Sequence, residues 1–130
     1  MNPAPIRGMA GVLIWTEGPR FEAMARFYRD TLGLVPRSSK DDFISFDWNG
    51  VRLSVGVHDR VRGRSADPLR VMINLAVEDI EAVHARLQRA GVSFTRPPER
   101  EEWGGVVATF ADPDGNTLQL MQLPVGRAAG

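Results

Sequence analysis

The sequence predicts an α+β protein in which two βαβββ modules, at about residues 9–59 and 69–123, form a curved mixed sheet around a cleft. Three observations predict this fold. The chain has 130 residues, the length of a single domain with a substantial core. Its apolar residues alternate between the two-residue period of strands and the three-to-four-residue period of helices. The same order of segments occurs twice, on either side of a polar linker at residues 60–68.

The first module begins with a short β-rich apolar run at residues 11–16, which predicts a strand. An amphipathic helix is predicted over residues 21–32, where apolar side chains recur every three or four positions. Gly33 stands where a glycine commonly ends a helix. Residues 43–57 then predict a hairpin, because Asn49-Gly50 separates two β-rich runs and favours a tight turn.

The second module repeats this order. Residues 71–77 predict a strand, Asp79 is placed to cap a helix, and Gly91 is placed to end it. The helix carries His84 on its apolar stripe, which predicts a partly buried structural residue. Residues 106–123 predict a hairpin with Asp114-Gly115 at its turn. We therefore interpret Asp112 and Asp114 as turn residues and not as a catalytic carboxylate pair.

Composition and charge exclude several function classes. The formal net charge is zero, which disfavours nucleic-acid binding, and no apolar run reaches membrane-spanning length. The absence of cysteine excludes disulfides, a thiol nucleophile and a thiolate metal site. The sequence thus fits a cytoplasmic protein that binds neither nucleic acid nor membrane.

Three motifs carry a family resemblance: FYRDTLGL at residues 27–34, VEDI at residues 77–80 and FADPDGN at residues 110–116. With these motifs in this order, the chain resembles the vicinal-oxygen-chelate superfamily, which includes glyoxalase I, extradiol dioxygenases and bleomycin-resistance proteins. The resemblance implies a glyoxalase/bleomycin-resistance-like fold and a homodimer. In the metal-dependent members, it also implies four inward side chains that hold a divalent metal, from the first and last strand of each module.

The internal repeat assigns those four positions to neutral side chains: Leu13, Ser54, Met72 and Gln119. Divalent ions in such sites need carboxylate or imidazole ligands, which none of these residues supplies. We therefore expect no metal and no cofactor. The amide of Gln119 then has two interpretations. It either forms hydrogen bonds with a ligand, or it bonds only to the neighbouring chain and water.

Other residues are predicted to point to the same face of the sheet as these four positions, because they lie two residues away on the same strand. Trp15 follows Leu13 by two residues, and Asn74 follows Met72 by two. Leu13, Trp15 and Met72 then form an apolar floor with sparse polar points, which is typical of a small-molecule pocket; the same residues could instead fill the cleft as core. Arg52 either pairs with an anionic group of the ligand or reaches solvent. Trp103, in a polar loop at residues 96–105, is either a lid over the pocket or a dimer contact.

These observations predict a metal-free protein that binds a small, largely apolar or aromatic molecule, in a sequestering or resistance role. One alternative is an enzyme of glyoxalase, lyase or dioxygenase type with a non-standard metal site that includes His58 or Gln119. A second is a metal-free acid–base enzyme that uses His58, since histidine titrates near neutral pH. The third is an interaction protein with a filled cleft.

Overall fold

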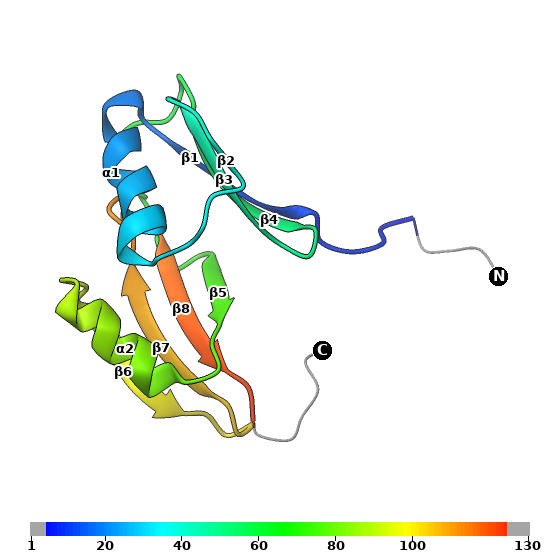
Figure 1. Ribbon diagram of the computed structural model, residues 1–130, viewed down its shortest axis with the longest axis vertical. Helices are drawn as coiled ribbons and strands as arrows, with labels where there is room; N and C mark the ends of the chain where they lie inside the picture. The colour runs from blue at the N-terminus through cyan, green and yellow to red at the C-terminus, as the bar shows by residue number, and fades with distance from the viewer. Residues whose placement is uncertain (1–4, 125–130) are drawn as a thin grey trace. The chain divides into compact units, whose positions relative to one another are not determined.

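The computed structural model describes residues 5–124 and divides the chain into two compact units, one ending at Gly63 and the other beginning at Arg64. Each unit contains a four-stranded mixed sheet with a helix along one face (Figure 1). The predicted α+β class is therefore confirmed, with the order β, α, β, β, β in both units. No helix among the described residues is long and apolar enough to cross a membrane.

The first sheet has the order β1-β4-β3-β2, with β1 parallel to β4 and the other pairs antiparallel. The elements of this unit are β1 (Gly11–Thr16), η1 (Gly18–Arg20), α1 (Phe21–Arg26), η2 (Phe27–Thr31), β2 (Ser38–Ser39), β3 (Phe43–Trp48) and β4 (Val51–Val57).

The predicted helix of the first unit is divided. After α1 the chain widens into the π-helical turn η2, in which the Leu32 N–H donates to the Phe27 carbonyl five residues earlier. Gly33 then takes a φ of 76°, so it ends the helix as predicted. Met24 and Tyr28 are fully buried, as expected of the predicted apolar stripe.

The second sheet has the order β5-β8-β7-β6, with β5 parallel to β8. Its elements are β5 (Met72–Ala76), α2 (Ile80–Arg89), β6 (Phe94–Arg100), β7 (Val106–Ala111) and β8 (Thr117–Gln122). The predicted cap is confirmed, because the Asp79 carboxylate accepts a hydrogen bond from the Ala82 N–H at 3.1 Å. A second cap comes from β8, where the Gln122 side-chain oxygen accepts from the Ile80 N–H at 2.7 Å.

Two sequence-based boundaries were wrong. The segment predicted as a loop at residues 96–105 is strand β6 up to Arg100, and its prolines are tolerated because β6 is an edge strand with register shifts between Arg96 and Glu99. The strand predicted at residues 71–77 is shorter, and Val71 lies before β5 and is exposed.

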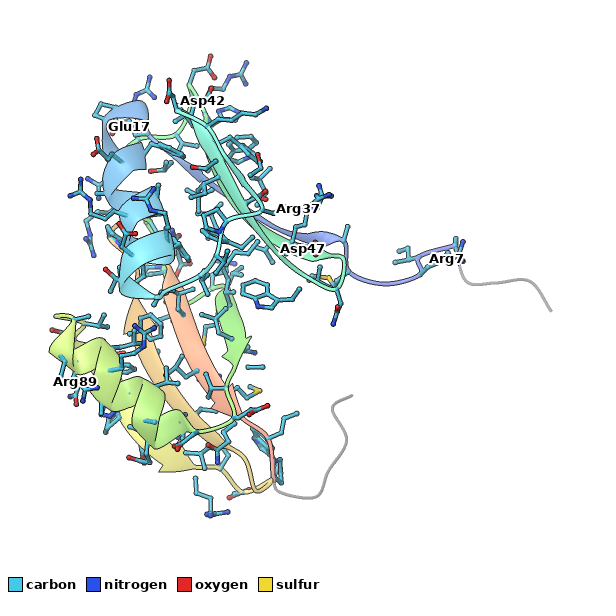
Figure 2. All side chains as sticks on the ribbon, in the orientation of Figure 1. Arg7, Glu17, Arg37, Asp42, Asp47 and Arg89 are labelled. Carbon is cyan, nitrogen blue, oxygen red and sulfur yellow. The ribbon has the colours of Figure 1, made fainter. Side chains whose placement is uncertain are left out.

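The linker at residues 60–68 is solvated only in part. Its second half binds the turn between β7 and β8: the Arg64 guanidinium donates to the Pro113 carbonyl at 3.0 Å, and the Ser65 N–H donates to the Asp114 carbonyl at 2.7 Å. In its first half, the Gly63 N–H donates to the carboxylate of Glu17, which Figure 2 labels, at 3.0 Å. The linker therefore contributes fixed contacts to both units.

Candidate functional site

The face of the first sheet opposite α1, called here the open face, consists of three rows of side chains. The residues that alternate with them along the strands, such as Ile14, Leu53 and Val55, are buried on the helix side. Directly opposed residues of neighbouring strands share a face, so the register defines the rows across β1, β4 and β3. The aromatic row is Trp15, Gly56 and Phe43; the serine row is Leu13, Ser54 and Ser45; the charged row is Gly11, Arg52 and Asp47.

The aromatic row places two rings over a glycine. A Cβ added at Gly56 would lie 2.7 Å from Cδ2 of Phe43 and 3.0 Å from Cζ3 of Trp15. Both rings therefore occupy the space above Gly56 that a side chain would need. Trp15 also contacts His58 edge-to-face, with ring centroids 5.2 Å apart and an interplanar angle of 69°. Despite these contacts, Trp15 is 41% exposed.

The serine row combines an exposed leucine with two largely buried serines. Leu13 is 46% exposed, whereas Ser54 and Ser45 are 7% and 5% exposed. Neither serine hydroxyl forms a hydrogen bond with another described residue. A third serine, Ser38 of β2, lies opposite Ser45 and extends the row. The middle of the open face thus presents small hydroxyl groups with unused hydrogen-bonding capacity.

The charged row contains a loose ion pair. Arg52 Nε lies 3.7 Å from Asp47 Oδ1, and about half of the arginine side chain is exposed. The other Asp47 oxygen accepts a hydrogen bond from the Gly50 N–H at 3.3 Å, at the hairpin end of the sheet where Figure 2 labels Asp47. A separation of 3.7 Å is too long for a hydrogen bond, so the guanidinium keeps most of its donors for other partners.

His58 follows β4 directly and lies beside the aromatic row. Its Nδ1 accepts a hydrogen bond from the Arg60 N–H at 3.0 Å and lies 3.4 Å from Asp59 Oδ1. In the neutral ring, an accepting Nδ1 places the proton on Nε2. His58 therefore offers a donor at Nε2, and it would have to give up the Arg60 bond to act as a base through Nδ1.

In the second sheet, Gln119 belongs to a polar chain that crosses three strands. Its Nε2 donates to Asn74 Oδ1 at 3.0 Å, and the Thr109 hydroxyl lies 3.5 Å from its Oε1. The residue opposite Gln119 is Asn74, while Met72 lies opposite Thr117 and is 38% exposed. Of the two interpretations of this amide, the contacts favour bonding within the protein, because both ends of the side chain have a partner.

The residues at the predicted metal positions do not fit a divalent ion in either unit. In the first, Leu13 faces Ser54, and leucine has no donor atom. In the second, the side chains available are the neutral groups of Met72, Asn74 and Gln119. Among residues 5–124, no group of three or more histidine, cysteine, aspartate or glutamate side chains comes together in a way that could hold a metal. Neutral donors of this kind offset little of the cost of removing water from a divalent ion.

Trp103 packs within its own loop. A Cβ added at Gly105 would lie 2.0 Å from the Trp103 ring, so the indole rests on the glycine backbone, and Trp103 is 47% exposed. The loop is joined to β6 through Arg96, which binds Glu101 and Glu99 at 2.8 Å each. The hydrogen bonds to Glu101 and Glu99 raise the pKa of Arg96. The contact of Trp103 with a ligand or a second copy stays a prediction.

Sequence reasoning missed several residues of the open face, among them Phe43, Ser45, Asp47 and Gly56. A signal was present in β3, because Phe43, Ser45 and Asp47 alternate with the buried Ile44 and Phe46. The sequence alone did not show which residues of β4 stand opposite them, and that pairing creates the rows.

Comparisons with known proteins agree with this architecture. The family model of the Glyoxalase/Bleomycin resistance protein/Dioxygenase superfamily matches residues 18–120. The uncharacterized protein YraH of Bacillus subtilis strain 168 is 26% identical over 116 residues, which cover 79% of this chain and 90% of that protein. A bleomycin resistance protein of Klebsiella pneumoniae is 32% identical over 65 residues, which cover 43% of this chain and 52% of that protein. The crystal structure of a glyoxalase/bleomycin resistance protein/dioxygenase from Nocardioides matches with a TM-score of 0.75 and 20% identity, covering 100% of this chain and 91% of the other.

Proposed function

Because the chain belongs to the Glyoxalase/Bleomycin resistance protein/Dioxygenase superfamily, we propose that it binds a small, largely apolar or aromatic molecule without a metal, in a sequestering or resistance role. The observation that carries the proposal is the pair Leu13 and Trp15, which are 46% and 41% exposed on one face of β1. The partial likeness to a bleomycin resistance protein supports the sequestering role.

The physical argument rests on the surface that these side chains leave in water. Burying apolar area stabilises a complex by about 25 cal/mol per Å², so an exposed indole beside an exposed leucine is a source of binding energy. The polar groups nearby are few and small, as in ligand pockets that orient a mostly apolar molecule. On the second sheet, Met72 and Asn74 supply a similar mixture.

The proposal is tested by making Trp15 the sole fluorophore. The sequence contains three tryptophans, so the double variant Trp48→Phe, Trp103→Phe leaves Trp15 alone. A library of small aromatic and apolar compounds is then screened for saturable changes in its emission, and Trp15→Leu in the wild-type background serves as the binding-deficient control. We expect at least one compound to bind in the micromolar range and, by isothermal titration calorimetry, to lose affinity in Trp15→Leu. If all compounds leave the emission unchanged, the interaction-protein alternative is favoured.

A metal-free acid–base enzyme is the second candidate, because His58 contacts Trp15 at the edge of the open face. The engagement of its Nδ1 by the Arg60 N–H weighs against this role. A ligand found in the screen decides the question. Turnover of that ligand that His58→Gln abolishes, while its binding persists, would establish the enzyme.

A metal-dependent glyoxalase, lyase or dioxygenase activity is tested by elemental analysis of the purified protein. The proposed function expects less than a tenth of an equivalent of nickel, zinc, manganese or iron. Close to one equivalent of metal that is removed by Gln119→Ala would overturn it, since Gln119 would then be a ligand.

We also propose that the protein forms a homodimer. The family resemblance suggests it, and β1 and β5 each lie at the edge of their sheet with one side unpaired by the described strands. Light scattering at micromolar concentration should give twice the mass of the 130-residue chain; the mass of a single chain would contradict this proposal.

A further inference from the structure

We infer that the ligand of the open face is an aromatic carboxylate, with its ring against Trp15 and its carboxylate between the serine row and Arg52. This inference rests on the proposed function and names the chemical class of the ligand. It follows from the order of the three rows along β4. Gly56 lies in the aromatic row, Ser54 in the serine row and Arg52 in the charged row.

The aromatic end is built to hold a flat ring. Trp15 lies edge-to-face with His58, with ring centroids 5.2 Å apart, and its ring and that of Phe43 both border the space above Gly56. Its remaining surface is exposed, so a ligand ring can stack on an indole whose orientation is already set. His58 adds an Nε2–H donor at the margin, because its Nδ1 accepts from the Arg60 N–H. This end therefore favours a ring that carries an acceptor group near the Nε2–H of His58.

The serine row supplies two hydroxyl donors that a ligand on the open face can reach. Ser54 and Ser45 are more than nine-tenths buried, and neither hydroxyl bonds to another described residue. Their oxygens are not among the buried side-chain atoms that lack a partner in the described part of the chain, so they reach the surface of the open face and can bond to water or to a ligand. Both hydroxyls can donate, and neighbouring strands place them about 5 Å apart. Two donors at that separation match the two oxygens of one carboxylate.

Arg52 of the charged row determines the sign of the ligand charge. Asp47 lies 3.7 Å from Nε of Arg52 and is itself held by the Gly50 N–H, so its carboxylate stays on the Nε side of the guanidinium. Of the described carboxylates, Asp47 is the one that pairs with Arg52. The two Nη groups are then left to form the paired hydrogen bonds that arginine makes with a carboxylate. Asp47 acts as a positioning residue in this arrangement.

The spacing of the rows sets the size of the ligand. Successive rows are two residues apart along β4, which corresponds to about 7 Å. A carboxylate placed between the serine row and Arg52 therefore lies about one row from the ring bound at Trp15. Two fused rings with a directly attached carboxylate approach this length.

The test compares 2-naphthoate with its neutral analogue 2-naphthamide by isothermal titration calorimetry. For the wild-type protein we expect the carboxylate to bind about tenfold more tightly than the amide, and this preference to shrink as salt is raised. Arg52→Gln should abolish the preference by weakening carboxylate binding only. Arg26→Gln is the matched control, since Arg26 pairs with Glu22 on α1, on the helix side of the sheet. It should keep the full preference.

Two further variants test the serine row and the aromatic row separately. Ser54→Ala, Ser45→Ala should weaken carboxylate binding about fivefold, and Trp15→Leu should weaken both probes. Equal affinities of acid and amide, both sensitive to Trp15→Leu, would overturn the carboxylate inference and leave the proposed function intact. Absence of binding by both probes at millimolar concentration would also overturn it, while the fluorescence screen decides the proposed function separately. Circular dichroism and thermal melting check that each variant is folded.

Discussion

Replacing Gly56 by alanine tests whether the aromatic row is built as described. Gly56 lies within β4, and its φ is not positive, so alanine can adopt its backbone conformation. The obstacle is steric, because the new Cβ would lie 2.7 Å from Phe43 Cδ2 and 3.0 Å from Trp15 Cζ3. At least the Phe43 ring must move, and the Trp15 ring must give by a few tenths of an ångström or more.

Two opposing effects set the size of the change. A glycine-to-alanine substitution at a compatible backbone position stabilises a protein by about 0.4–1 kcal/mol, because the unfolded chain loses conformational freedom. Forcing an extra carbon into packed side chains costs about 1–3 kcal/mol. Both clashing atoms belong to side chains, and Trp15 is partly exposed, so the rings can yield to some extent. We expect the free energy of unfolding to fall by about 1–2 kcal/mol.

Urea unfolding and Trp15 emission measure this change together. With a urea m value of about 2 kcal/mol per M, the midpoint should fall by about 0.5–1 M. In the Trp48→Phe, Trp103→Phe background, the emission should shift as the indole leaves Gly56. Gly18→Ala is the matched control, since its nearest neighbour is Val57 Cγ1 at 3.8 Å, an ordinary contact. If Gly56→Ala is as stable as Gly18→Ala and the emission is unchanged, the Phe43 and Trp15 rings do not occupy the space above Gly56 as described.

Three further substitutions test other parts of the structure. His84→Phe should raise the free energy of unfolding by about 1 kcal/mol, because the ring keeps its edge contact with Phe94 while the buried Nε2, which lacks a partner among the described residues, is removed; a loss of more than 1 kcal/mol in urea unfolding would contradict this. Asp112→Ala should cost about 3 kcal/mol by the same measurement, since its buried carboxylate accepts three hydrogen bonds in the β7–β8 turn, and a cost below about 1 kcal/mol would show that the turn forms without them. Gly105→Ala should expel the Trp103 indole, whose ring lies 2.0 Å from the added Cβ, and red-shift its emission; an unchanged spectrum would show that the ring does not rest there.

The sequence predicted the regular elements well, because their burial follows simple periods. In β4 the buried Leu53 and Val55 alternate with the open-face residues Arg52 and Ser54, as a strand with one face on the core requires. The prediction of α2 from its cap and final glycine was also accurate, and Gly91 takes a φ of 95°. Local rules of this kind need no knowledge of distant parts of the chain.

The sequence did not predict features that depend on partners far along the chain. The second cap of α2 comes from Gln122, 42 residues after Ile80, and no local pattern indicates that pairing. The polar residues, prolines and glycines at 96–105 predict a loop, and only the position of β6 at the sheet edge explains why Pro97 and Pro98 lie in a strand. Likewise, the alternation of side chains along β4 predicts that Ser54 lies on the open face. Only the register of β4 with β3 shows that Ser45 lies opposite it and completes a row of hydroxyls.

The position of Gln119 shows why a motif and a site must be argued separately. The FADPDGN turn that precedes it is stabilised by Asp112, which accepts hydrogen bonds from the N–H groups of Asp114 and Asn116 at 2.9 Å each. Those bonds form the turn whatever residue follows on β8. The motif therefore reports the fold, and it leaves the chemistry of the sheet face undetermined.

What the face does is set by side chains that the turn does not constrain. At position 119 a carboxylate would carry a charge toward a metal, whereas the amide present donates to Asn74 and accepts from Thr109, so that its polar atoms are satisfied within the sheet. In the first unit the hydroxyls of Ser45 and Ser54 have no such partner among residues 5–124, and the adjacent indole is partly exposed. The unsatisfied hydrogen-bonding capacity and the exposed apolar area thus lie together on the open face. For this reason we place the ligand there and regard the amide of Gln119 as part of the scaffold.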